Sequence, residues 1–143
     1  MPLRKSALRK NTKVELLKHV PLFSQCTQKE LAAVAFVADE IDLREGRELT
    51  RQGTPGREFF VLVEGEADVR RNGRKLRTLK SGDFFGEIAL LTKRPRTATV
   101  VARTPVRVLV VTDRAFRRML EEFPEMQTKV LRALVDRLSG DDL

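Results

Sequence analysis

The chain has 143 residues, of which 41% are hydrophobic and 34% charged, and its formal net charge is +8. This length and composition predict one folded domain with a real core, and they exclude a disordered chain and two ordinary domains. The only cysteine, Cys26, excludes an internal disulfide and a multi-cysteine metal site, and no apolar run is long enough to span a bilayer. We therefore expect a protein of a reducing cytoplasm, without membrane insertion and without a bound metal.

The positive charge raises the question of nucleic acid as a partner. Basic residues concentrate in the first 18 residues and again over residues 70–80 and 114–118. Sequence-specific binding needs side chains that read bases as well as charge, and no segment supplies both. We expect the charge to form a solvated surface and nucleic acid not to be a partner. A regulator that contacts nucleic acid through its basic N-terminal arm is the alternative.

A helical region is predicted after a loose N-terminal arm. Residues 1–11 are basic and unpatterned, which predicts the arm, and residues 12–143 are predicted to form the single domain. Thr12–Glu15 and Thr27–Glu30 both fit the S/T-x-x-E capping box, which predicts that a helix starts at each of them. Pro21 is predicted to end the first of these helices.

Short β-branched and aromatic runs follow, separated by glycine-containing turns. The predicted strands cover residues 41–43, 48–51, 59–63, 67–71, 76–79, 97–102 and 106–111. Asn72-Gly73, the strongest two-residue hairpin signal, joins the fourth and fifth of these runs. Short strands at intervals of roughly 8–12 residues indicate an all-β sandwich or barrel, and we predict a β-jelly-roll barrel. The predicted fold class is therefore mainly β with flanking helices.

Two helices are predicted to close the domain. Asp113 suits the N-cap of the first, Pro124 the first position of the second, and Gly140 its C-terminal cap. The second helix has a broad apolar stripe made of Met126, Val130, Leu131, Leu134, Val135 and Leu138. Such a stripe exceeds what one sheet edge needs. It can pack on its own domain, form a dimer contact or serve as a movable lid, and the pattern leaves these three open.

The segment Phe84–Val100 carries the most specific chemistry of the sequence. Gly86 allows close backbone approach to a ligand, and the helix formers after it predict a short helix over residues 87–92 whose first N–H groups suit an anion. Arg96 can clamp a phosphate with its planar fork, while Glu87 can accept hydrogen bonds from sugar hydroxyls. Together they predict a nucleotide site. A strand–turn–strand with a surface arginine is the alternative.

With the predicted architecture, this segment resembles the cyclic nucleotide-binding domain shared by the catabolite activator protein, the regulatory subunits of cyclic-nucleotide-dependent protein kinases and cyclic-nucleotide-gated channels. The phosphate-binding cassette of that family reads roughly F-G-E-[LIVM]-A-L-x-x-x-x-P-R-[TSA]-A-T-V, and residues 85–90 and 95–100 match it. The resemblance extends over about residues 12–139, with a further match at 60–66. It implies N-terminal helices, a short helix embedded at the phosphate site and two C-terminal helices.

The resemblance also implies a 3′,5′-cyclic nucleotide as the ligand. Arg96 would pair with the cyclic phosphate, Glu87 would accept from the ribose 2′-OH, and Gly86 would give close backbone approach. Backbone N–H groups of Ile88, Ala89 and Ala98 would complete the phosphate cradle. The full set implied for ligand binding is Phe85, Gly86, Glu87, Ile88, Ala89, Pro95, Arg96, Thr97 and Ala98.

Two further features bear on the identity of the base. Thr97 follows the arginine, at a position where cGMP-binding members of the family carry a threonine that contacts guanine. We nevertheless favour cAMP, the commoner ligand of the family, with cGMP as the alternative. A residue of the last helix would cap the base, and Leu131, Arg132 and Val135 are the candidates.

The sequence thus predicts a cytoplasmic sensor or regulatory module and not an enzyme, because no catalytic constellation or metal-ligand set stands out. Cyclic nucleotide binding would shift the C-terminal helices and so signal to a protein partner, or to a second copy bound through the last helix. No cofactor is expected, since cAMP or cGMP would be the ligand. A ligand-free dimerisation or interaction module of the same fold is the alternative.

Overall fold

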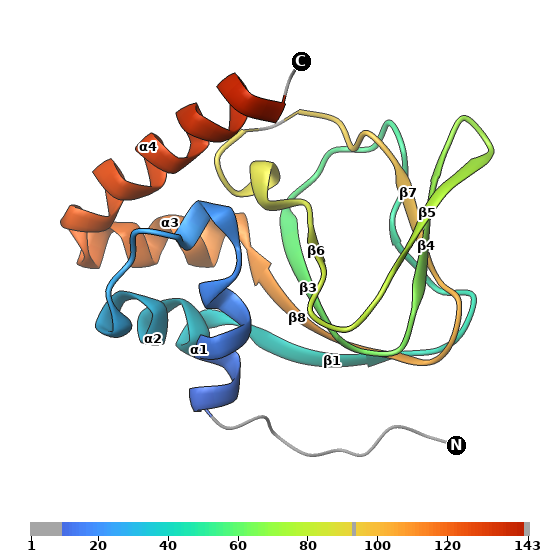
Figure 1. The fold of residues 1–143 in the computed structure, drawn as a ribbon, viewed down its shortest axis with the longest axis horizontal. Helices are drawn as coiled ribbons and strands as arrows, with labels where there is room; N and C mark the ends of the chain where they lie inside the picture. The colour runs from blue at the N-terminus through green and yellow to red at the C-terminus, as the bar shows by residue number, and fades with distance from the viewer. Residues whose placement is uncertain (1–9, 93, 142–143) are drawn as a thin grey trace.

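The computed structural model of the protein describes residues 10–92 and 94–141, which form two β-sheets with helices gathered at one end (Figure 1). The helices are α1 (Lys10–Lys18), α2 (Gln28–Val37), α3 (Asp113–Glu122) and α4 (Pro124–Asp141), with the short 3₁₀ helices η1 (Pro21–Phe23) and η2 (Glu87–Leu90). The strands are β1 (Asp39–Leu43), β2 (Glu48–Thr50), β3 (Glu58–Glu64), β4 (Ala67–Arg71), β5 (Arg74–Leu79), β6 (Phe84–Phe85), β7 (Thr99–Ala102) and β8 (Val106–Thr112).

The two sheets each have four antiparallel strands, in the orders β1-β8-β3-β6 and β2-β7-β4-β5. The prediction of a mainly β jelly roll with flanking helices is confirmed. The prediction of a barrel is wrong, because no ladder joins one sheet to the other among the described strands. A physical reason lies in β6, which has two residues and ends where Gly86 turns the chain into η2.

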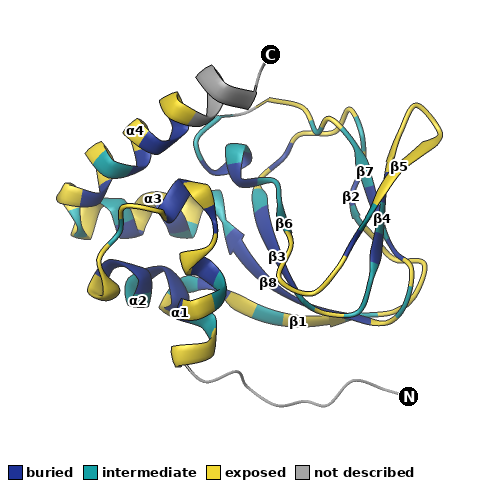
Figure 2. Ribbon diagram, viewed as in Figure 1, coloured by how far each residue is buried: buried dark blue, intermediate teal, exposed yellow. Residues whose placement is uncertain are grey.

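The central strands β3 and β8 are buried on both faces, as Figure 2 shows by their dark blue colour. Phe60, Leu62 and Val108 belong to the core between the two sheets. Phe59 and Leu109, one position along each strand, belong to the core that the sheet shares with the helices. Because successive side chains alternate between faces, a strand with cores on both sides reads as a continuous apolar run.

The hairpin predicted at Asn72-Gly73 joins β4 to β5. Asn72 has a φ of 52° and Gly73 a φ of 79°, the positive pair that a type I′ turn requires. The side chain of Gln52 exchanges two hydrogen bonds of 2.9 Å with Asn72 and so ties the hairpin to the chain after β2.

Of the predicted helix starts, the second capping box is confirmed and two others are wrong. Thr27 accepts from the Glu30 N–H at 3.2 Å, and the Glu30 carboxylate accepts from the Thr27 N–H at 2.8 Å. The first box fails because α1 already begins at Lys10, which places Thr12 inside the helix. The N-cap of α3 is Thr112, not the residue after it, because the extended end of β8 directs the Thr112 hydroxyl at the N–H of Ala115. The remainder of the expected N-terminal arm, residues 1–9, lies outside the described residues.

The last helix, α4, starts at Pro124 as predicted and runs past Gly140, which therefore does not cap it. Its stripe divides into two parts. Met126, Val130 and Leu134 are buried against the helical core, whereas Leu131 is 59% and Val135 53% exposed. Leu138 lies beyond the side chains that the structure describes. Among the described helices, α4 included, none combines the length and the apolar character that a membrane crossing needs.

Candidate functional site

Every residue predicted for ligand binding, from Phe85 to Ala98, lines a single cavity of about 540 Å³. The walls are η2, the chain before β7, and the inner face of the sheet that contains β4 and β5. The predicted short helix over residues 87–92 exists as η2, a 3₁₀ helix that ends at Leu90. The nine residues named from the sequence therefore lie at one cavity, although the helix is shorter than expected; that they bind a ligand stays a prediction.

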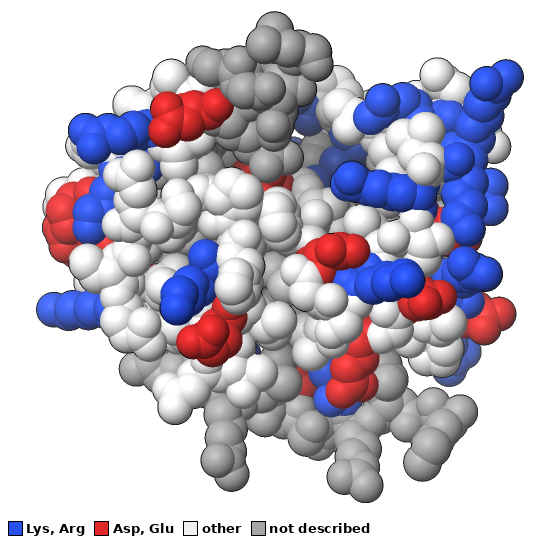
Figure 3. All heavy atoms as spheres, viewed as in Figure 1, with Lys and Arg blue, Asp and Glu red and all other residues white. Residues whose placement is uncertain are grey.

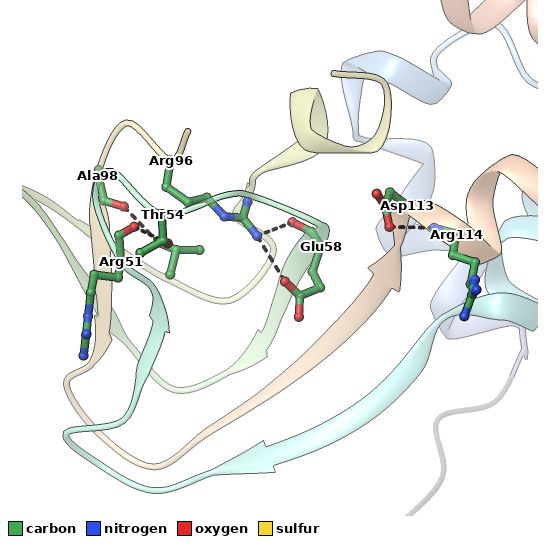
Figure 4. A network of polar contacts seen from close by, with 8 residues as sticks. Arg51, Thr54, Glu58, Arg96, Ala98, Asp113 and Arg114 are labelled. Atoms are coloured by element: carbon green, nitrogen blue, oxygen red, sulfur yellow. Dashed lines mark hydrogen bonds and ion pairs between the residues drawn. The ribbon is translucent and has the colours of Figure 1, made fainter. Parts of the chain in front are cut away.

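Arg96 projects into this cavity from an irregular segment that is held by backbone hydrogen bonds. The Arg96 N–H donates to Thr54 O at 2.8 Å, and the Arg96 carbonyl accepts from the Gly53 N–H at 2.8 Å. The side chain is 8% exposed, and its Nη2 donates to the Glu58 carbonyl at 2.8 Å and lies 3.4 Å from the Glu58 carboxylate (Figure 4). The guanidinium carbon also lies 5.9 Å from the centre of the Phe60 ring, within reach of a cation–π contact.

The positive charge of Arg96 is largely shielded from solvent. Burial lowers the pKa of the Arg96 guanidinium, and the charge and hydrogen bond of Glu58 oppose that shift. An arginine stays protonated in proteins under such conditions, so the cavity contains a fixed positive charge. Such a charge, largely shielded from water, suits an anion that replaces the missing solvent.

Two glycines make room for this arginine. At Gly86, which has a φ of 83°, an added Cβ would lie 2.6 Å from Nη1 of Arg96 and 2.9 Å from the Glu58 carbonyl oxygen. At Gly56 an added Cβ would lie 2.8 Å from Nε of Arg96. Gly86 was expected to bring the backbone near a ligand, and the structure shows that it also lets the arginine fold back. Gly56 was missed, because nothing in its local sequence indicates the packing of Arg96.

Glu87 supplies the second charge of the cavity. It is the first residue of η2, is 3% exposed and lines the same cavity as Arg96. One buried carboxylate and one buried guanidinium thus belong to one hollow, and ligands that pair a phosphate with hydroxyl groups match that combination. The N–H of Ala89 donates to the Gly86 carbonyl at 3.0 Å, so it is already satisfied by the first turn of η2.

Comparison with known proteins decides the family. The profile of the family described as "Cyclic nucleotide-binding domain" matches residues 40–123, more than half of the chain. The chain belongs to this family. The match includes η2, the segment around Arg96 and the strands that frame the cavity, so the resemblance predicted from the cassette is confirmed.

The relatives of this cyclic nucleotide-binding domain include kinase regulatory subunits and a transcriptional regulator. A cAMP-dependent protein kinase regulatory subunit from Aspergillus niger is 40% identical over 106 residues, which are 73% of this chain and 26% of that protein. The chain thus spans about a quarter of the length of the curated relatives it matches.

Two solved structures share the fold of this domain. The N-terminal domain of a transcriptional regulator from Streptomyces coelicolor A3(2) is 31% identical with a TM-score of 0.79, over 89% of this chain and 95% of that one. The structure of cAMP-bound PfPKA-R (141-441) is 25% identical with a TM-score of 0.66, over 89% of this chain and 46% of that one.

The candidates for capping a base do not lie at the cavity of this cyclic nucleotide-binding domain. Leu131, Arg132 and Val135 are exposed on α4 and contribute nothing to the cavity lining. Their proposed role therefore requires α4 to occupy a different position, and it stays a prediction.

Sequence reasoning missed a set of arginines at the mouth of the cavity. Arg71, Arg77 and Arg94 line it together with Arg96. Nε of Arg71 donates to the Thr97 carbonyl at 3.0 Å, which ties the β4–β5 hairpin to the cassette. Figure 3 shows Lys and Arg side chains gathered over the side of the molecule where β4 and β5 lie. The signal was available, because Arg71 lies two residues after the inward-facing Val69 and therefore shares its face of the sheet.

Proposed function

We propose that this domain is a regulatory sensor that binds a 3′,5′-cyclic nucleotide, cAMP in the first place, in the cavity of Arg96 and Glu87. The observation that carries the proposal is the presence of these two oppositely charged, almost fully buried side chains in one hollow. The relatives support cAMP, since several are cAMP-dependent protein kinase regulatory subunits and one similar structure is cAMP-bound.

The single negative charge of a cyclic phosphate matches the one guanidinium at the base of the cavity. Arg96 carries five N–H donors, and Glu58 engages only its Nη2 nitrogen. The phosphate cradle would add the N–H groups of Ile88 and Ala98 before that of Ala89, which already has an acceptor. Glu87 would accept from the ribose 2′-OH. Phe85 stacks on Phe60 with ring centres 4.9 Å apart and would form the apolar wall beside the sugar.

A second candidate ligand, cGMP, is favoured by Arg77 and Thr97, which both line the cavity. Guanine presents two neighbouring acceptors, O6 and N7, to which one arginine can donate twice, whereas adenine presents an acceptor and a donor there. Arg77 would therefore favour guanine over adenine, whereas the similarity to cAMP-dependent relatives favours cAMP. A paired titration with both nucleotides decides between them.

The site has a direct route to the C-terminal helices. Leu90, in the last position of η2, is fully buried in the core that also contains Phe116 and Met119 of α3. A ligand that draws η2 around its phosphate would therefore move a side chain on which α3 packs. The resulting preference of the nucleotide for one helix arrangement would be the signal to a protein partner, or to a second copy of the chain.

Calorimetric titration of the chain with cAMP and with cGMP tests the proposal. Heat of binding with one or both nucleotides is expected; if both bind, the heat of one should disappear when an excess of the other occupies the same site. Absence of heat with both nucleotides at millimolar concentration would instead favour the alternative, a ligand-free dimerisation or interaction module of the same fold. Light scattering on the same samples reports whether the chain pairs with itself.

A further inference from the structure

A second hollow, of about 700 Å³, lies beside the start of α3 and shares no lining residue with the nucleotide cavity. We call it the α3 groove. Its charged lining residues come from the segment before β3 and from the exposed side of α3: Arg57, Arg114, Arg117, Arg118, Asp113 and Glu121. Its charged lining thus consists of four arginines and two carboxylates.

The arginines of the α3 groove are available to a partner. Arg114, Arg117 and Arg118 follow the three- and four-residue spacing that places side chains on one face of a helix. Arg117 lies 3.8 Å from the Asp113 carboxylate, whose other oxygen accepts from the Arg114 N–H at 2.7 Å. Among the side chains that the structure describes, those of residues 11–92 and 94–136, Arg114 and Arg118 form no ion pair.

The lining restricts the chemistry of the occupant. Apart from Pro55 and Gly56, every residue that lines the groove is charged, so no aromatic side chain is present there for a base to stack on. Arginine forks bind carboxylates with two parallel hydrogen bonds. The arginines of α3 recur every three or four residues, which is also the spacing of side chains on one face of a second helix lying alongside. A helical peptide with carboxylates every three or four residues matches both the charge and the spacing.

We propose that the α3 groove binds an acidic, helical segment of a partner protein through Arg57, Arg114 and Arg118. This site lies outside the nucleotide cavity, and the proposal that it binds a peptide does not rest on the proposed function. The arginine spacing on α3 favours the helical peptide, and duplex DNA, the other polyanion of suitable size, is compared with it directly in the test.

Three consecutive residues connect the groove to the nucleotide cavity. Gly56 lines the groove while its backbone packs against Arg96, and the Glu58 carbonyl accepts from Arg96. Between them, the Arg57 carbonyl accepts from the N–H of Asp113 at 2.8 Å. Figure 4 shows Arg96 on one side of Glu58 and the start of α3 on the other. A ligand on Arg96 and a peptide on α3 therefore act on the same residues, so their binding is coupled; this part rests on the proposed function.

The test uses the full chain and a fluorescein-labelled helical peptide whose glutamates recur every third and fourth residue, with fluorescence anisotropy at about 100 mM salt. The double variant Arg114→Gln, Arg118→Gln should weaken peptide binding by about 5- to 30-fold. The matched double variant Arg70→Gln, Arg74→Gln, on the exposed β4–β5 hairpin, should change it by less than about twofold. Circular dichroism checks that both variants keep the fold, which is expected because all four arginines are exposed.

Three results would overturn the site: equal binding of a peptide with glutamines in place of the glutamates, equal losses in the two double variants, or tighter binding of duplex DNA than of the peptide. The coupling is tested separately by repeating the peptide titration with saturating cAMP. A shift in peptide affinity of at least about fivefold is expected. An unchanged affinity in a chain whose cAMP binding is seen by calorimetry would overturn the coupling, whereas absence of calorimetric heat would refute the proposed function instead.

Discussion

Replacing Arg96 by alanine is expected to weaken cyclic nucleotide binding by about 2–3 kcal/mol, which is about 30- to 150-fold in Kd. A hydrogen bond to a charged group contributes about 1.5–3 kcal/mol, and the upper half of that range applies where water screens the contact poorly. The Arg96 side chain is 8% exposed and is backed by the Phe60 ring and the Glu58 carbonyl, so little water can replace it. The loss should be of similar size for cAMP and cGMP, because both carry the same phosphate.

Calorimetry with each nucleotide measures the effect, and two matched variants make it specific. Arg70→Ala removes an exposed arginine outside the cavity and should leave Kd within about twofold. Arg96→Lys keeps the charge without the planar fork and should fall between wild type and Arg96→Ala. Since the Arg96 side chain packs between Gly56 and Gly86, thermal unfolding must show that the alanine variant is folded. A folded Arg96→Ala variant with a Kd within threefold of wild type would refute the phosphate clamp.

Other changes test separate parts of the same reasoning. Gly86→Ala should weaken nucleotide binding by about tenfold, because a positive φ strains alanine by about 1 kcal/mol and the new Cβ displaces Arg96; an unchanged Kd in calorimetry would contradict this. Thr97→Ala should reduce affinity for cGMP more than for cAMP, and equal losses in paired titrations would remove this residue from base selection. Lys129→Gln should lower the free energy of unfolding in urea, because it removes the 2.8 Å partner of the buried Glu30 carboxylate. Burial opposes the shift, yet hydrogen bonds from Lys129 and the helix cap hold the pKa of Glu30 below its ordinary value of 4.5. That stabilisation is therefore present above pH 4.5 and is lost as the pH falls through the lowered pKa, so the acid loss of stability should be shallower in Lys129→Gln; parallel pH curves would contradict it.

The cassette could be predicted from the sequence because its chemistry is local. Gly86, Glu87 and Arg96 lie within one short segment, and each residue type is suited to one part of a nucleotide. The type I′ hairpin and the Thr27 capping box were predictable for the same reason, since each depends on two to four neighbouring residues.

What could not be predicted depends on residues that are distant in the sequence. Glu58 receives Arg96 from 38 positions away, and the need for Gly56 arises only from that packing. The open edge between the sheets depends on the shortness of β6, which no periodicity shows in two residues. The N-cap of α3 is Thr112, one residue before the predicted Asp113. Thr112 is also the last residue of β8, so the pairing of that strand determines where the helix begins.

The position of α4 bears on two questions that the local sequence left open, the role of its apolar stripe and the residue that would cap the base. In this structure Met126 and Val130 are buried and Lys129 pairs with Glu30, a residue 99 positions away, while Leu131 and Val135 are more than half exposed. Covering those two aliphatic side chains on a nucleotide base would contribute about 1–2 kcal/mol. Releasing the ion pair between Glu30 of α2 and Lys129 of α4 would oppose that gain. The two effects balance only if Met126 and Val130 stay buried, so we expect a cyclic nucleotide to move α4 without uncovering these two core side chains.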